Sequence, residues 1–142
     1  MPLRGYDSLC EENQKIITSQ DSGQTRVHRA YNDKRCGVSQ YQIDGVVIKD
    51  GIRCDFLVMN EDDKSAYLIE LKGSDLEHAI KQLETTAERL KAQLHDYKVR
   101  YRIVCSRART HKIESSQFKK FKSAHRKKDE FICRENVIEE NI

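Results

Sequence analysis

The segment from residue 65 to residue 105 constrains the fold of this chain more than any other. Ser65–Lys72 (SAYLIELK) is apolar on both faces, which is typical of a strand covered on both sides of a sheet. Val99–Cys105 is a second strand candidate, in which apolar side chains alternate with Arg100 and Arg102. A helical pattern separates the two, and a strand–helix–strand unit of one sheet has parallel strands and a right-handed crossover. The segment therefore predicts an α/β fold.

The helix between these strands is predicted over residues 75–96. Ser74-Asp75-Leu76-Glu77 forms a capping box, in which the Ser hydroxyl and the Glu carboxylate satisfy free amides at a helix start. An apolar stripe at helical spacing follows, formed by Leu76, Ala79, Ile80, Leu83, Ala87, Leu90 and Leu94. Such a stripe must be covered by another element, and the sheet is the expected partner.

Two more strands are predicted before this unit. Tyr41–Ile48 leads into Lys49-Asp50-Gly51, and an Asp-Gly pair between two β-rich segments indicates a tight hairpin. Ile52–Met59 follows, and Asn60–Lys64 is predicted as the turn into Ser65–Lys72. Together these segments predict an antiparallel meander of three strands.

The N-terminal part of the chain has weaker patterns. Residues 7–20 are predicted to form a first helix, because their apolar residues recur at helical spacing and Asp7 or Ser8 can cap the start. Residues 21–37 are polar and aperiodic, and we expect a loop that is long for a small domain. With 142 residues, the chain predicts a single domain (1–142), with a core over about 7–105 and a C-terminal part over 106–142.

The C-terminal part is strongly basic. From Ser106 to Lys128 there are nine Lys and Arg residues against one acid, Glu114. A cationic segment in a chain of net charge +3 suggests a polyanionic partner, although a solvated helix face explains it equally well. Residues 115–127 are predicted as a helix anchored by two phenylalanines, and 130–134 as a short last strand. The candidate nucleic-acid-binding residues are Lys119, Lys120, Lys122, Arg126, Lys127 and Lys128.

Composition excludes several classes of protein. No apolar run approaches the ~18–20 residues that a membrane-spanning helix needs, so no membrane partner is expected. The first residues lack the apolar stretch of a secretory signal. Five cysteines, none at C-x-x-C spacing, give little support to a zinc site and indicate reduced thiols in a cytoplasmic protein.

A candidate chemical site lies on the strands of the predicted meander. Glu70 and Lys72 are two residues apart, so they share one face of their strand. A hairpin around residues 60–64 places Asp55 opposite residues 69–70 on the adjacent strand. Two carboxylates and a lysine on apolar strands are costly unless they are paired or bind a metal. Mg²⁺ favours one or two carboxylates with water and phosphate, but an ordinary ion pair with Lys72 is the alternative.

This pattern resembles the PD-(D/E)XK nuclease superfamily. Its signature appears here as Asp55, a 14-residue gap, and Glu70-Leu71-Lys72, with Cys54 where the family often has proline. The predicted order of elements over about 7–105 is similar to the αβββαβ core of the restriction-endonuclease-like fold, a mixed sheet flanked by helices. The resemblance implies a nuclease that hydrolyses phosphodiester bonds, in DNA in preference to RNA, with Mg²⁺ or Mn²⁺ as cofactor.

The resemblance also implies residue roles. Asp55 and Glu70 would hold the metal with the backbone carbonyl of Leu71, and Lys72 would assist the attacking water. Two further residues have weaker support: Glu12 as an added ligand on the first helix, and Gln82 as a supporting residue of the catalytic centre. Each has a plain alternative, an exposed residue at a helix start for Glu12 and a solvent-facing helix residue for Gln82.

Two hypotheses for the whole molecule stay open. The first is an active nuclease, which we expect to act as a homodimer because cutting two strands needs two sites. The second is a non-catalytic protein of the nuclease fold that binds nucleic acid or a protein partner. The intact set of Asp55, Glu70 and Lys72 favours the first.

Overall fold

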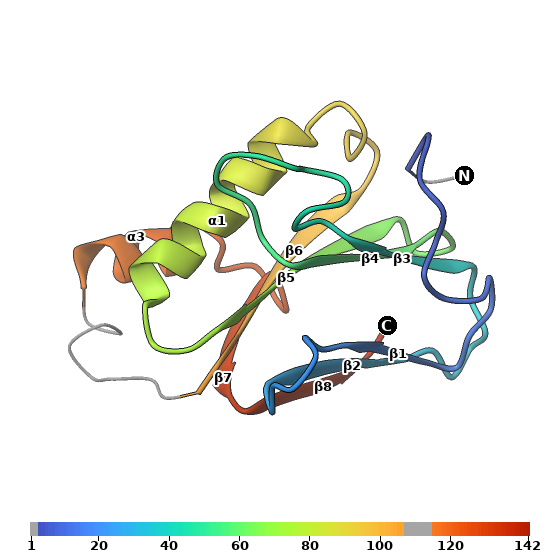
Figure 1. Cartoon of the computed structure of the whole chain (residues 1–142), viewed down its shortest axis with the longest axis horizontal. Coiled ribbons are helices and arrows are strands. Elements are labelled where there is room, and N and C mark those ends of the chain that lie inside the picture. Colours follow the sequence, from blue (N-terminus) through green and yellow to red (C-terminus); the bar gives the residue numbers. More distant parts are fainter. Residues whose placement is uncertain (1–2, 107–114) are drawn as a thin grey trace.

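A mixed five-stranded sheet lies at the centre of the computed structural model, which describes residues 3–106 and 115–142 (Figure 1). The sheet contains, in spatial order, β3 (Val38–Gln42), β4 (Phe56–Asn60), β5 (Ser65–Lys72), β6 (Lys98–Cys105) and β7 (Phe131–Glu135). The pairs β3–β4 and β4–β5 are antiparallel, and β5–β6 and β6–β7 are parallel. The predicted meander and the predicted parallel pair are therefore confirmed, and the chain belongs to the α/β class.

Two helices, α1 (Leu76–Arg89) and α3 (Ser116–Ala124), lie over the same face of this sheet (Figure 1). They bury the predicted leucine stripe and both anchoring phenylalanines, Phe118 and Phe121, in one core with the sheet.

The N-cap of α1 is Asp75, whose side chain accepts a hydrogen bond from His78 N, so the predicted capping box at Ser74 is wrong. The predicted end at residue 96 is also wrong, because the last turn tightens after Arg89.

A second, three-stranded sheet covers the other face, in the order β1 (Ile16–Ser19), β2 (Val27–Tyr31) and β8 (Val137–Asn141) (Figure 1). The pair β1–β2 is antiparallel and β2–β8 is parallel. Ile17, Ala30 and Ile138 from this sheet share a core with Phe56, Val58, Tyr67, Ile69, Leu71 and Val104 from the large sheet. The five-stranded sheet is thus buried between helices and a second sheet.

The predicted first helix over residues 7–20 is wrong. These residues form turns and then β1, in which buried Ile17 and Ser19 alternate with exposed Ile16 and Thr18. This period of two is that of a half-buried strand and not of a helix. The predicted loop over 21–37 is wrong in part, since it contains β2, and β8 has no counterpart in the sequence prediction.

The link between β3 and β4 also differs from the prediction. The strand predicted over Tyr41–Ile48 ends at Gln42, and the predicted tight Asp-Gly hairpin is a longer connection over residues 43–55. It folds back against α1, where Arg89 Nη1 donates a hydrogen bond of 2.6 Å to Asp50 O.

Within the described residues, no helix is long and apolar enough to cross a bilayer.

Candidate active site

Asp55 and Glu70 meet where β4 begins and β5 nears its end. Asp55 N donates to Ile69 O at 3.1 Å, and Asp55 Oδ2 accepts from Leu71 N at 2.8 Å. The adjoining pair is Phe56 with Ile69, so the predicted alignment of Asp55 with residues 69–70 is confirmed. The two carboxyl groups are close enough to share a hydrogen bond when one is protonated.

The pair is held away from water. Glu70 is 2% exposed, and its Oε1 has no hydrogen-bond partner among the described residues. Burial raises the pKa of Glu70 well above its usual range, the Asp55 carboxylate raises it further, and Lys72 opposes both. Burial also raises the pKa of Asp55, to about 6, against the lowering effect of the Leu71 amide. Both shifts mean that this site disfavours two free negative charges.

Lys72 completes the predicted set. Its Nζ lies 3.9 Å from Glu70 Oε2, and its side chain is 23% exposed, so Lys72 is the most exposed member of the set. The structure therefore brings together Asp55, Glu70 and Lys72 as the i, i+2 spacing and the register predict.

Residues 3–106 and 115–142 contain no group of three or more His, Cys, Asp or Glu side chains placed to hold a metal. A cation here would depend on two carboxylates with backbone and water oxygens.

Gln82 and Thr86 support the segment that leads into Asp55. Gln82 Nε2 donates to Arg53 O at 2.9 Å, and Thr86 Oγ1 accepts from Cys54 N at 2.8 Å. The helix α1 thereby fixes two residues that immediately precede Asp55. Gln82 is therefore half-buried and in contact with the site segment rather than directed into solvent.

Glu12 does not join the pair. It is exposed in a turn before β1, and its carbonyl accepts from Val38 N at 2.7 Å. Val38 pairs with Asn60, at the end of β4 opposite to Asp55. The predicted role of Glu12 depended on a first helix that does not form.

Other charged residues, which the sequence did not indicate as a group, lie near the site. Asp21 and Asp44 both raise the pKa of Asp55. Arg26 Nη1 donates to Ser106 Oγ at 2.6 Å, and Ser106 N donates to Lys72 O at 3.1 Å, which places Arg26 at the same end of the large sheet. Asp21 and Arg26 come from the link between β1 and β2, so only the packing of the second sheet reveals them.

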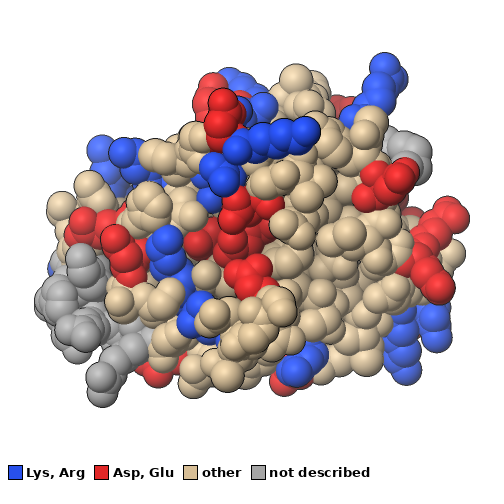
Figure 2. Space-filling model, in the orientation of Figure 1, with Lys and Arg blue, Asp and Glu red and all other residues tan. Residues whose placement is uncertain are grey.

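The basic residues of the C-terminal part are separated from the pair. All six predicted nucleic-acid-binding residues are exposed on α3 or in the turn after it. One flank of α1 contacts the segment before Asp55 through Gln82 and Thr86, whereas the opposite flank faces α3 across a groove that includes Glu77 and Lys120. Because α1 lies between them, the expected common cleft of α3 and the carboxylates is not formed. On the face in Figure 2, acidic side chains gather near the middle with basic ones beside them.

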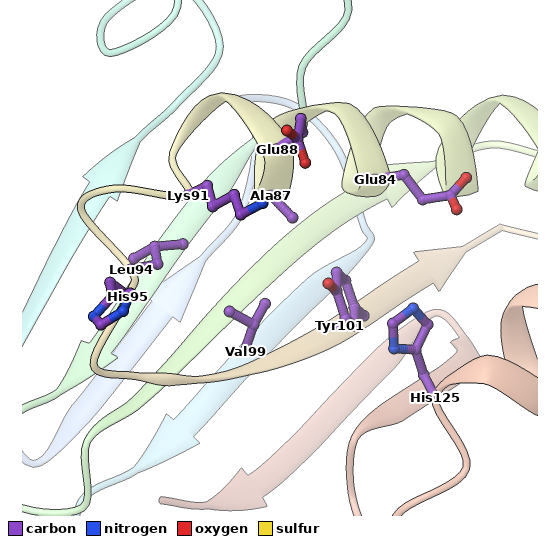
Figure 3. A pocket seen from close by; sticks show the side chains of 9 residues that line it. All are labelled: Glu84, Ala87, Glu88, Lys91, Leu94, His95, Val99, Tyr101 and His125. Carbon is purple, nitrogen blue, oxygen red and sulfur yellow. The ribbon is translucent and has the colours of Figure 1, made fainter.

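A cavity of about 520 Å³ lies elsewhere, between α1, the start of β6 and the end of α3 (Figure 3). Glu84 and Glu88 line it from the helix, and His125 lies across from them beside Tyr101. Its lining residues are Glu84, Ala87, Glu88, Lys91, Leu94, His95, Val99, Tyr101 and His125. None of these belongs to the set around Asp55, so this cavity is separate from the candidate site.

Comparison with known proteins adds no assignment: no protein-family model, no curated protein and no solved structure matches the chain.

Proposed function

We propose that this chain is a metal-dependent nuclease that hydrolyses phosphodiester bonds, in DNA in preference to RNA. The observation that carries the proposal is the buried contact between Asp55 and Glu70 with the Lys72 ammonium 3.9 Å from Glu70. Two carboxyl groups in contact within apolar strands are unfavourable unless a proton or a cation is shared between them. A site that retains this arrangement beside a partly exposed lysine suits metal-assisted hydrolysis.

The arrangement of strands supports the same proposal. An antiparallel meander, a helix and a parallel strand follow one another as in the PD-(D/E)XK core, with Asp55 just before the second strand of the meander and Glu70-Leu71-Lys72 ending the third. The N-terminal helix of that core is replaced here by the sheet of β1, β2 and β8. The proposal therefore rests on the five-stranded part of the molecule.

The residues at the site fit Mg²⁺ or Mn²⁺. Glu70 Oε1 is a buried acceptor without a partner among the described residues, and Asp55 lies beside it. The N–H of Leu71 points to Asp55, and in a strand the C=O of a residue points to the same side, so the Leu71 carbonyl is directed there as well. Two carboxylates, one carbonyl and water molecules form the oxygen set that Mg²⁺ prefers.

In the proposed reaction, each protein group has a separate task. A bound divalent ion would stabilise charge on the phosphate and lower the pKa of a water molecule. Asp55 is oriented by the Leu71 amide, and Glu70 must release its proton for both carboxylates to bind the ion. The Lys72 ammonium, at the exposed edge, positions the attacking water and offsets the negative charge that develops on the phosphate oxygens.

Cleavage of a supercoiled plasmid with Mg²⁺ or Mn²⁺ tests this function. The wild type should nick or linearise the plasmid, and EDTA should prevent it. The variants Asp55→Asn and Lys72→Ala should lose at least about 100-fold in rate, because each removes a group in contact with the reacting atoms. Glu12→Gln is the matched control, since Glu12 is exposed and away from the pair. A wild type that binds DNA but never cuts it would support a non-catalytic binding protein instead.

A further inference from the structure

A second charged feature lies at the start of β6. The other end of this strand lies beside Lys72 of β5. A pocket of about 490 Å³ is lined by Lys98, Val99, Arg100, Lys127, Lys128 and Glu130, and we call it the β6 pocket. β6 is eight residues long and pairs with β5 so that Lys98 lies beside Ser65 and Cys105 beside Lys72. At about 3.3 Å of rise per residue, the pocket lies roughly 23 Å along the strand from the Lys72 end.

The backbone explains why a pocket forms here. β7 pairs with β6 only from Tyr101 onward, and Tyr101 N donates to Glu130 O at 2.7 Å. The first three residues of β6 therefore extend beyond the first residue of β7 and have no partner in that strand. The turn before β7 folds over them, with Asp129 in a left-handed conformation (φ 59°). Arg100 Nη1 reaches the carbonyls of this turn, at 3.3 Å from Asp129 O and 3.4 Å from Lys128 O.

The charges that line the β6 pocket are not balanced. Four of its six lining residues are Lys or Arg, and none of these four forms an ion pair with a described residue. The single acid, Glu130, is engaged by His125, whose Nδ1 lies 2.7 Å from Glu130 Oε2. Four cationic groups around one hollow repel each other, and a bound anion would remove that repulsion.

We propose that the β6 pocket binds backbone phosphates of a nucleic acid. This identification of the anion rests on the proposed nuclease function. The pocket contains no aromatic ring that a base could stack on, which suits a sugar-phosphate backbone better than a free nucleotide. Two of its lysines, Lys127 and Lys128, lie in the turn after α3, and the lysines of that helix are exposed as well.

The proposal gives the basic residues a defined position relative to the cleavage site. A duplex advances about 3.4 Å per base pair on each strand, so roughly 23 Å corresponds to about seven base pairs. Arg100 lies over the Tyr67 ring on the face of the sheet that β1, β2 and β8 cover, and Glu70 shares the helix face with Leu68, so a bound nucleic acid would pass around the edge of the sheet between the β6 pocket and the carboxylates. This arrangement does not require α3 and the carboxylates to line one cleft, and it is therefore compatible with the position of α1 between them.

Binding of a labelled 20-base-pair duplex in EDTA, measured by fluorescence anisotropy across a range of NaCl concentrations, tests the proposal without any cleavage. The double variant Lys98→Ala/Lys127→Ala should bind about tenfold more weakly at 0.1 M salt. Its slope of log K against log[salt] should be shallower by nearly 2, since each lost phosphate contact removes about 0.9. Lys15→Ala is the matched control, because Lys15 is also exposed but precedes β1. Thermal unfolding should show that all variants remain folded.

Each outcome is decisive for the pocket. Unchanged affinity and slope in the double variant, or a wild type that does not bind the duplex, would overturn the proposal. Binding of ATP that depends on Lys98 and Lys127, with duplex binding unaffected, would assign the pocket to free nucleotides and also overturn it. Failure of the nuclease proposal is seen separately, because a protein that binds the duplex through this pocket but never cuts a plasmid contradicts only the catalytic assignment.

Discussion

At the scale of single residues, the contact between Asp55 and Glu70 places an electrostatic cost inside a stable sheet. Glu70 is 2% exposed and keeps an acceptor oxygen without a partner among the described residues. A proton on the pair offsets this cost in the metal-free protein, and a divalent ion would offset it in the loaded protein. The site is therefore expected to exchange stability for the ability to bind a cation.

Glu70→Gln should stabilise the metal-free protein at alkaline pH. The folded-state pKa of Glu70 lies above its unfolded value, so its contribution to stability is full at acid pH and is lost as the pH rises through the folded pKa. An uncharged Gln does not titrate, and the variant should be more stable than the wild type by about 1–3 kcal/mol at pH 8.5 in EDTA. Urea unfolding at pH 5 and pH 8.5 measures this difference.

Mg²⁺ provides the internal control for this prediction. Millimolar Mg²⁺ should raise the stability of the wild type at pH 8.5 and leave Glu70→Gln nearly unchanged, because the variant lacks one anionic ligand. A Glu70→Gln protein that is less stable than the wild type at both pH values would show that the buried carboxylate is compensated by contacts within the protein.

The central residues of the site could be predicted from sequence, but its surroundings could not. The spacing of Glu70 and Lys72 and the register across a short turn place these residues beside Asp55, since both depend on local geometry. Asp21 and Arg26 reach the same end of the sheet from another sheet, and no local pattern carries that information. Glu12 shows the reverse error, a role inferred from a helix that does not form.

At the scale of elements, α1 positions the site through contacts at its start and in its middle. Its start is capped by Asp75, whose side chain accepts from His78 N at 3.0 Å. Its middle holds the backbone of Arg53 and Cys54 through Gln82 and Thr86. The apolar stripe made the helix predictable, but Ser74 and Asp75 are both favourable N-cap residues, and the local sequence does not choose between them.

Asp75→Ala should destabilise the protein by about 0.5–2 kcal/mol, because it leaves a helix N–H without its side-chain acceptor. Ser74→Ala, one residue earlier, is the matched control and should change stability by less than about 0.5 kcal/mol. Urea unfolding at pH 7 measures both. The reverse order of effects would restore Ser74 as the capping residue.

Thr86→Val should lower both stability and any activity of the site. Thr86 is buried, and its hydroxyl is the acceptor for Cys54 N, next to Asp55. Loss of this acceptor should cost about 1–3 kcal/mol, since a buried amide loses its partner. Thr85→Val is the control, because Thr85 on the same helix has no side-chain hydrogen bond in the described residues. Equal unfolding free energies for the two variants, from urea titrations, would contradict the supporting role of Thr86.

At the scale of the whole molecule, a buried polar group connects the two sheets. Glu140 on β8 accepts from Arg102 Nε at 2.7 Å and lies 2.7 Å from His28 Nε2 on β2. Arg102 belongs to β6, so this group joins the sheet that carries the carboxylate pair to the sheet behind it. The sequence gives no direct signal for this connection, because β8 is short, lies at the end of the chain and pairs with a strand over 100 residues away.

Glu140 should make the fold sensitive to acid. Burial alone would raise the pKa of Glu140, but hydrogen bonds from His28 and Arg102 lower it to about 2. A carboxylate with a depressed folded pKa contributes stability above its unfolded pKa of about 4.3, and this contribution is lost as the pH falls toward 2. Glu140→Gln should therefore cost about 3–5 kcal/mol at pH 7, because Arg102 stays buried without its counter-ion.

The difference between wild type and Glu140→Gln should shrink as the pH falls from about 4.5 to 2, where the wild-type carboxylate takes up its proton. Urea unfolding at pH 7, 4 and 2.5 follows this convergence. Glu139→Gln is the matched control on the same strand. Its carboxylate is about half exposed, accepts from the Tyr31 hydroxyl and lies 3.5 Å from Arg29, so its loss should cost no more than about 1 kcal/mol at any of these pH values. A constant difference between wild type and Glu140→Gln across the range would mean that the two sheets are joined by packing, with no contribution from the charge of Glu140.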